Sequence, residues 1–253
     1  PLDPSDSFPQ SSFMAWKTYQ YSDCCKLISS RLYHAIPSSG DGSPGTNYDE
    51  ITYGYDLRDR QTRTTSPGGT ISWTVFDIRS LPIGTYVGTN DAGATETDPT
   101  GGGVNPVNNM AAVVVNEYDD GVAGGDGNLT QVTQLVDVST SRVMNYGYDW
   151  RDRRITAAGA EAYFEKWIYD NLDRTTRVDR YNTSESGPLL SRNETLYDDL
   201  SRVYQRITYA VDPSDGSIGN ALTDNVWYDP AGNLAKSLPS GSSLFSKTLY
   251  NSL

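Results

Sequence analysis

Residues 146–154 read Tyr-Gly-Tyr-Asp-Trp-Arg-Asp-Arg-Arg, and residues 53–60 read Tyr-Gly-Tyr-Asp-Leu-Arg-Asp-Arg. Looser copies of this string begin at Tyr169, Tyr197 and Tyr228, and a weaker copy begins at Phe76. Self-similarity of this kind is typical of repeat architectures. We therefore expect an array of similar units rather than one irregular globule.

Each copy keeps the same residue types at fixed positions. If the aromatic residue is position 0, position +1 is Asp, position +4 is mostly Asp, Ser or Gly, and position +5 is mostly Arg. The residues at +4 tolerate turns or a positive φ, and the flanking residues are aromatic or β-branched, so each copy predicts a β-hairpin. The Asp is expected to accept hydrogen bonds from turn amides, and the Arg to pair with an Asp or lie over a neighbouring Tyr ring. The residues assigned to this structural motif are Tyr55, Asp56, Arg60, Tyr148, Asp149, Arg153, Tyr169, Asp170, Arg174, Tyr197, Asp198, Arg202, Tyr228 and Asp229.

The motif resembles the YD repeat, Tyr-Asp-x-x-Gly-Arg, of the Rhs and teneurin-like proteins, from about Tyr48 onward. The family's Gly is mostly Asp or Ser here, so the turns should be stiffer. The resemblance implies an all-β fold of tandem YD-repeat β-hairpins that form a spiralling sheet, part of a hollow shell or repeat array. We expect an irregular segment with a degenerate repeat over residues 1–47, and the hairpin array over residues 48–253. The array is expected to be truncated at both ends, as an internal fragment of a longer polypeptide.

Two further copies are less regular. Tyr21 precedes Cys25 by four residues and Lys26 by five, which matches positions +4 and +5. In the copy at Tyr118, the glycine of the turn is Gly127, so the interval is nine residues rather than four. A higher-order repeat of about 93 residues is also present, because 148 − 55 and 169 − 76 both equal 93.

Three segments between the copies yield predictions of their own. Gly88–Asn109 is expected to be a long polar loop, because it is rich in Gly, Asn, Thr and Pro. Pro213–Asn220 is expected to be a hairpin loop for the same reason. Ala160–Asp170 is predicted to be a strand, since its second half is aromatic and β-branched and its counterpart, Thr70–Asp77, has a strong β pattern.

Composition narrows the function classes. The 253 residues are 36% hydrophobic and include 18 Tyr but only 5 Phe, which suits thin sheets with partly wet faces. A net charge of −12 disfavours nucleic acid binding, which needs clustered Lys and Arg. The sequence lacks the run of about 18 apolar residues that a membrane helix needs, so no membrane insertion is expected.

Two acidic segments are candidates for binding a hard cation such as calcium through oxygen ligands. The first segment lacks the spacing of an EF-hand loop, and ordinary solvated loops are the alternative explanation for both. Apart from this possibility, no cofactor is expected. The candidate ligands are Asp91, Glu96 and Asp98 in the long loop, and Asp119, Asp120 and Asp126 after Tyr118.

Asn-x-Ser/Thr sequons, which can accept glycans, occur at Asn128, Asn182 and Asn193. Cys24 and Cys25 are adjacent, and His34 is the only His, so a metal or redox centre is not indicated. Ordinary buried thiols are expected, with a vicinal disulfide or pairing outside the chain as alternatives.

The sequence favours a non-enzymatic role. A single His leaves no obvious base for a nucleophilic triad, and the turn motif accounts for much of the Asp. We expect a structural segment of a large bacterial Rhs-type protein, secreted or on the cell surface, whose partners are the rest of its polypeptide. The resemblance implies a cocoon around a C-terminal toxin as one use. A filament or adhesin built from copies of itself is a second. A carbohydrate-binding module for surface glycans is a third, and it requires Trp73, Trp150, Trp167 or Trp227 on an exposed face.

Overall fold

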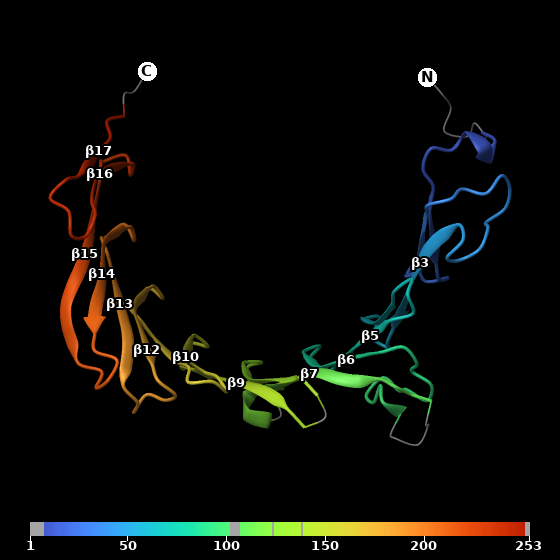
Figure 1. The fold of residues 1–253 in the computed structure, drawn as a ribbon, viewed down its shortest axis with the longest axis horizontal. Helices are drawn as coiled ribbons and strands as arrows, with labels where there is room; N and C mark the ends of the chain where they lie inside the picture. The colour runs from blue at the N-terminus through green and yellow to red at the C-terminus, as the bar shows by residue number, and fades with distance from the viewer. Residues whose placement is uncertain (1–7, 102–106, 123, 138, 251–253) are drawn as a thin grey trace. The chain divides into compact units, whose positions relative to one another are not determined.

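The computed structural model describes residues 8–101, 107–122, 124–137 and 139–250 (Figure 1). These residues form 17 β-strands and a few short 3-10 turns, and every ladder between strands is antiparallel. The all-β prediction is therefore confirmed. None of the helical turns described is long and apolar enough to span a membrane.

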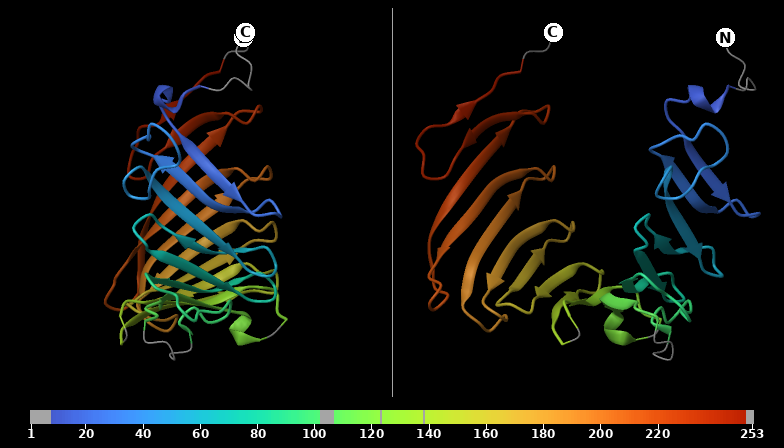
Figure 2. Two further views of the ribbon diagram at one scale, coloured as in Figure 1. Left: turned by 90° about the vertical axis from the view of Figure 1, so that its right-hand side faces the viewer. Right: turned by 45° about the vertical axis from the view of Figure 1, so that its right-hand side comes forward.

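The chain folds as two compact units. The first contains residues 1–116 and 134–140, and the second contains residues 117–133 and 141–253. In each unit, consecutive strands lie side by side in chain order (Figures 1 and 2).

The first unit is a meander in which each strand from β1 to β7 pairs with the next. A short 3-10 turn, η1 (Gln10–Ser12), precedes it. The strands are β1 (Lys17–Tyr21), β2 (Leu27–Tyr33), β3 (Tyr48–Tyr55), β4 (Gln61–Thr65), β5 (Ile71–Phe76), β6 (Pro82–Gly88) and β7 (Ala111–Tyr118).

The second unit is a longer meander in which each strand from β9 to β17 pairs with the next. A 3-10 turn, η3 (Asp119–Gly121), follows Tyr118. The strands are β8 (Leu129–Leu135), β9 (Ser141–Tyr148), β10 (Arg154–Ala158), β11 (Phe164–Tyr169), β12 (Thr175–Tyr181), β13 (Leu189–Tyr197), β14 (Val203–Val211), β15 (Ile218–Tyr228), β16 (Leu234–Leu238) and β17 (Ser246–Lys247).

The sheet has little conventional core. Most strand residues are half-buried, as expected for a thin sheet without a second layer over it. In β14 the burial alternates strictly between half-buried and exposed residues, which places one face of the strand more deeply than the other. The buried apolar side chains are Tyr33, Tyr48, Ile71, Val75, Met110, Ala157 and Leu189.

Two local predictions need correction. The strand predicted over Ala160–Asp170 is real only for Phe164–Tyr169, because Gly159–Tyr163 forms the turn between β10 and β11. The loop predicted over Pro213–Asn220 ends earlier, since Ile218 pairs with Val211 and opens β15.

Candidate functional site

The repeated feature of the molecule is the tight turn that joins the two strands of each motif hairpin. At Tyr148, the Asp149 amide donates to the Arg153 carbonyl at 3.0 Å and the Asp152 amide donates to the Asp149 carbonyl at 3.0 Å. The same pair of bonds closes the turns that follow Tyr21, Tyr55, Phe76, Tyr169, Tyr197 and Tyr228. The turn at Tyr21 thus has the motif geometry, although Ser22 stands where the other copies have Asp.

Position +4 has left-handed backbone geometry throughout, as the sequence predicted. Its φ lies between 59° and 70° at Cys25, Asp59, Ser80, Asp152, Asp173 and Ser201, and it is 89° at Gly232. A register shift beside each motif aromatic accompanies it, which is the signature of a turn that ends in a β-bulge. Non-glycine residues in this conformation store strain. The presence of Asp, Ser or Cys rather than Gly at position +4 therefore needs an explanation.

The carboxylate at +1 organises each turn. Asp149 Oδ1 accepts from the backbone N–H groups of Arg151 and Arg153, at 2.9 and 3.1 Å. Its Oδ2 accepts from Arg153 Nε at 2.8 Å and Nη2 at 2.6 Å. The same two-amide and guanidinium contacts hold Asp56, Asp170 and Asp198. Because one carboxylate satisfies the turn amides and the Arg together, the turn and the Arg rotamer are fixed as one unit.

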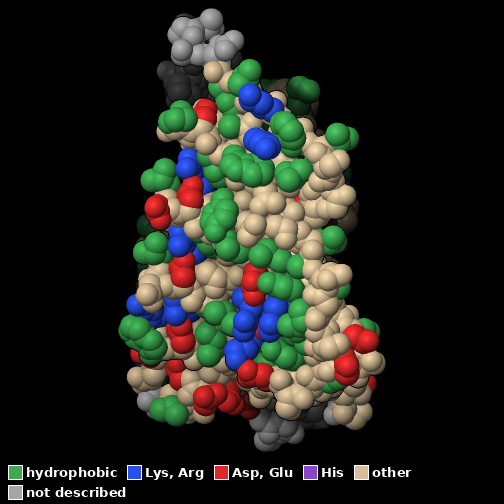
Figure 3. Space-filling model, turned by 90° about the vertical axis from the view of Figure 1, so that its left-hand side faces the viewer, with side chains coloured by type: hydrophobic (Ala, Val, Ile, Leu, Met, Phe, Trp, Pro, Cys, Tyr) green, Lys and Arg blue, Asp and Glu red, His purple; other side chains and the backbone are tan. Residues whose placement is uncertain are grey.

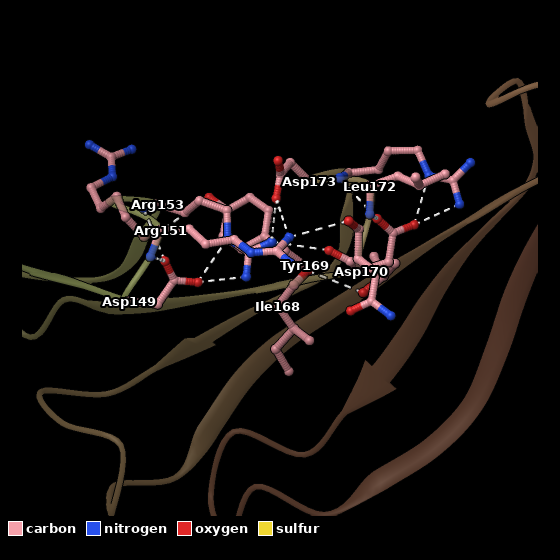
Figure 4. A network of polar contacts seen from close by, with 12 residues as sticks. Asp149, Arg151, Arg153, Ile168, Tyr169, Asp170, Leu172 and Asp173 are labelled. Carbon is pink, nitrogen blue, oxygen red and sulfur yellow. Dashed lines mark hydrogen bonds and ion pairs between the residues drawn. The ribbon is translucent and has the colours of Figure 1, made fainter.

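The guanidinium then reaches the next hairpin (Figure 4). Arg153 Nη1 donates to the Asp170 carbonyl at 3.0 Å and to Asp173 Oδ1 at 2.7 Å. The Arg153 guanidinium carbon lies 4.9 Å from the centroid of the Tyr169 ring. Arg153 therefore joins its own Asp149 to the aromatic ring, the turn carbonyl and the +4 side chain of the following copy.

This inter-repeat link recurs along the chain. Arg60 lies 4.8 Å from the Phe76 ring and donates to the Asp77 carbonyl and Ser80 Oγ. Arg174 lies 4.7 Å from the Tyr197 ring and donates to the Asp198 carbonyl and Ser201 Oγ. Figure 3 shows acidic and basic side chains alternating down one margin of the face in view.

Two copies without Arg use another donor for the same link. Lys26 lies 5.4 Å from the Tyr55 ring and pairs with Asp59, the +4 residue of the next hairpin. Asn128 takes the place of Arg in the Tyr118 copy, and its Nδ2 donates to Asp152 Oδ1 at 2.7 Å.

The link is incomplete in two copies. Arg202 lies 4.6 Å from the Tyr228 ring, but Gly232 at +4 offers no side chain for it to bond. In the Phe76 copy, Leu81 stands at +5 and has no polar group to donate.

The tyrosine hydroxyls form a second connection that was not predicted. Tyr169 OH donates to the Arg154 carbonyl at 2.9 Å, which is position +6 of the preceding copy. The hydroxyls of Tyr55, Tyr148, Tyr197 and Tyr228 donate to the equivalent carbonyls of Leu27, Leu129, Thr175 and Val203. Phe76 is the motif aromatic that lacks this hydroxyl. The preference for Tyr over Phe was visible in the composition. The carbonyl that accepts each hydroxyl could not be predicted, because it depends on the strand register.

Hydrogen bonding shifts the titration of the motif carboxylates. The side chain of Arg202 holds the pKa of Asp198 below its ordinary value, and that of Arg153 does the same for Asp149. For Asp229, the backbone N–H of Asn233 is the main cause of the lowered pKa. Each shift favours the ionised carboxylate in the folded state.

The candidate calcium ligands are mostly engaged with the protein itself. Asp91 pairs with Arg63 at 2.5 Å, Glu96 accepts from the Leu57 amide, and Asp98 accepts from Thr100. Asp119 accepts from the amides of Gly127 and Asn128. Asp120 and Asp126 are exposed. Within the described residues, no three acidic, His or Cys side chains converge as a metal site would require. A calcium site stays a prediction.

The three sequon residues have different surroundings. The Asn128 side-chain amide is engaged with Asp152, Asn182 is half-buried, and Asn193 is exposed on β13. Glycosylation at Asn128 would break an inter-repeat link, so Asn193 is the most accessible acceptor. Cys24 and Cys25 are exposed free thiols, rather than the buried thiols that the composition suggested.

The tryptophans required for sugar stacking are only partly available. Trp150 and Trp227 are exposed, whereas Trp73 and Trp167 are half-buried. Arg151 lies over Trp150, Arg154 over Trp167 and Lys236 over Trp227, each within 4.7 Å of the ring centroid.

A buried charge cluster in the second unit was also missed. Asp179 is fully buried and receives Nε and Nη2 of Arg192, at 2.7 and 2.8 Å. Arg177 pairs with the same carboxylate at 3.2 Å. The sequence does contain a signal for this cluster. Opposite charges stand two residues apart in two consecutive strands, at Arg177 and Asp179 and at Arg192 and Glu194. Beside this cluster lies an open cavity of about 420 Å³, lined in part by Arg177, Glu194 and Tyr197.

The fold and these interactions define an all-β hairpin-repeat protein. Comparison with models of protein families gives no match, and comparison with curated proteins gives none. Among solved structures, a complex of TcdB2-TccC3 with Cdc42 aligns with 89% of the chain at a TM-score of 0.57 and 12% identity. TcdB2-TccC3 aligns with 90% of it, with a TM-score of 0.57 and 13% identity. A Tc holotoxin pore from Photorhabdus luminescens, with a mutated TccC3, aligns with 88% of it, with a TM-score of 0.56 and 14% identity. This chain spans 11% of the length of each, and the likeness shows a shared fold.

Proposed function

We propose that this chain is a non-enzymatic structural segment of a large bacterial Rhs-type protein that is secreted or displayed on the cell surface. Its role is to build a β-shell or scaffold from tandem hairpins. The observation that carries the proposal is the link from each motif Arg to the next hairpin, as between Arg153 and Asp173. A side chain used to join one repeat to the next serves assembly of the array.

The chemistry of the motif supports a structural rather than a catalytic role. The carboxylates at +1 accept two turn amides and a guanidinium, so they have little remaining capacity to act as general bases. Their lowered pKa values keep them ionised, whereas a general acid needs a raised pKa.

Enclosure of a cargo polypeptide is the use that we favour. The fold likeness to TcdB2-TccC3 and to the Tc holotoxin pore supports it, because TccC3 occurs in that holotoxin and those chains are far longer than this one. In this proposal, the segment is one part of a wall, and its partners are other segments of the same polypeptide. A scaffold of repeated copies is the alternative.

Electron microscopy of the longest natural form of the protein tests this proposal. Discrete hollow particles, each made of one chain, are the expected result. Continuous fibres or regular head-to-tail assemblies would support the scaffold alternative and overturn the enclosure. Solid globules with a substantial helix content by circular dichroism would overturn both uses.

A further inference from the structure

One face of the second unit carries arginines that take no part in the motif links. Cross-strand register aligns Tyr146 with Ala157, Ala157 with Glu165, and Glu165 with Arg180. Because side chains alternate along a strand, Trp167 lies on the same face as Glu165, two residues away. Four adjacent strands, β9 to β12, therefore contribute to one patch.

Arg154 is held in this patch by aromatic rings on both neighbouring strands. Its guanidinium carbon lies 5.4 Å from the Tyr146 ring centroid on β9 and 4.6 Å from the Trp167 ring centroid on β11. Arg154 itself is exposed. A guanidinium packed against rings in this way keeps its N–H groups at its edge, where a ligand can reach them.

Arg180 is placed beside it in the same manner. Its guanidinium carbon lies 5.2 Å from the Tyr163 ring centroid, and the Tyr163 hydroxyl donates to Glu165 Oε2 at 2.7 Å. Burial, followed by Glu165, raises the pKa of Tyr163 to about 12, and the charges of Arg180 and Arg154 oppose that rise. The charges of Arg154 and Arg180 thus both act on the Tyr163 hydroxyl.

Glu165 lies opposite Arg180 in the cross-strand register, but neither Arg154 nor Arg180 forms an ion pair within the part of the chain that the structure describes. This differs from Arg60, Arg153 and Arg174, each of which is bonded to an Asp of its own turn. The contrast is notable in a chain with 32 acidic and 20 basic residues, where an exposed arginine has many carboxylates to choose from. The two arginines are therefore positively charged groups available to a ligand.

The surroundings restrict what that ligand can be. Arg154 covers Trp167, so stacking of a sugar on this ring is disfavoured. Nucleic acid binding needs a larger cluster of Lys and Arg along the backbone than these two arginines supply. A planar guanidinium edge instead matches a carboxylate, which it binds through two parallel N–H···O bonds.

We propose that Arg154 and Arg180, held against Tyr146, Trp167 and Tyr163, form a docking site for a short acidic peptide segment of a protein partner. One carboxylate binds each guanidinium edge. This site does not depend on the enclosure proposed above, since a filament or a wall could equally present it.

Binding of an oligopeptide of eight glutamates, followed by isothermal titration calorimetry at low salt, tests the site. Arg154→Gln and Arg180→Gln are each expected to weaken binding about tenfold, the equivalent of about 1.4 kcal/mol. Arg206→Gln is the matched control, because Arg206 is exposed on β14 and lies over no ring in the described structure. It is expected to change affinity less than about twofold.

Several outcomes would overturn the proposal. These are undetectable binding to the intact chain, an equal loss of affinity in the Arg206 variant, or tighter binding of a heparin fragment or oligonucleotide of equal charge. Thermal melting of each variant confirms that it is folded, and the Arg154→Lys variant separates bidentate binding from simple attraction. Lys retains the charge but not the planar fork, so it should restore only part of the affinity.

Discussion

Asp173 shows why a strained residue is retained at a turn where glycine would be easier. Its φ of 60° lies in the left-handed region, yet its carboxylate receives both Arg153 and Arg151 from the preceding hairpin. Glycine would relieve about 1 kcal/mol of strain but would remove the acceptor. The identity of the +4 residue is thus decided by the neighbouring repeat rather than by its own turn.

Replacing two +4 residues by glycine separates these effects. Cys25→Gly should raise the free energy of unfolding by about 1 kcal/mol, because the exposed Cys25 is a free thiol and only strain is relieved. The free energy of unfolding of Asp173→Gly should be lower than that of Cys25→Gly by about 1–2 kcal/mol. Asp173→Gly also loses the charge-assisted hydrogen bonds from the two arginines, which solvent partly screens. Urea denaturation of both variants measures the difference. Equal stabilisation by both substitutions would show that the link contributes nothing.

The motif carboxylates also predict how stability depends on pH. The folded pKa of Asp198 is depressed by Arg202, so the stability it provides is fully present above its unfolded pKa of about 3.9. As the pH falls through the unfolded and then the folded pKa, the unfolded state binds more protons and this stability is lost. The melting temperature should therefore drop between about pH 5 and pH 3. Asp198→Asn should melt lower at pH 7 and show a smaller drop, and an unchanged slope would contradict the assignment.

At the scale of the hairpin, the tyrosine hydroxyl offers a gain-of-function test. Phe76→Tyr should place a hydroxyl near the carbonyl of Gln61, which is position +6 of the Tyr55 copy. The new hydrogen bond should raise the free energy of unfolding by about 1 kcal/mol, and Tyr169→Phe should lower it by a similar amount. Chemical denaturation of both variants measures the pair. If neither substitution changes the free energy of unfolding, the hydroxyl contributes nothing, and the preference for Tyr over Phe arises from ring packing alone.

The elements also show how far the sequence alone could lead. Hairpin existence and the backbone at +4 were predictable, because residues such as Asp152 and Gly232 mark a local conformation. The partner of Arg153 on the next hairpin was not predictable, because it depends on which turns lie next to each other in the folded sheet. Asp179 and Arg192 were missed for the same reason, because cross-strand register brings them together. Ile218–Asn220 has loop composition but forms a strand because Val211 lies opposite it.

At the scale of the whole molecule, the links imply that coupling extends only between neighbours. Arg153 contacts the Tyr169 copy, whereas Arg202 serves the Tyr228 copy in a different part of the array. In such a quasi-one-dimensional array, the free energy of unfolding is approximately the sum of the stability of each repeat and the contribution of each interface between neighbouring repeats.

Double-mutant cycles test this coupling within the second unit. Arg153→Gln combined with Tyr169→Leu should show an interaction energy of about 0.5–1 kcal/mol, because the guanidinium lies over that ring. Arg153→Gln combined with Tyr228→Leu should be additive within about 0.5 kcal/mol. Free energies from urea denaturation supply the cycle. Strong coupling across the distant pair would contradict the neighbour-only description.

The turn that follows Tyr118 has a consequence for how such chains change over time. Its interval to the turn glycine is nine residues where the Tyr228 copy has four, yet Asn128 still reaches Asp152 on the following hairpin. Extra residues have been accommodated at a turn without loss of the connection beyond it. Turn tips are thus natural points for insertion during evolution, and an engineer could place a foreign epitope there while the link to the following hairpin is kept.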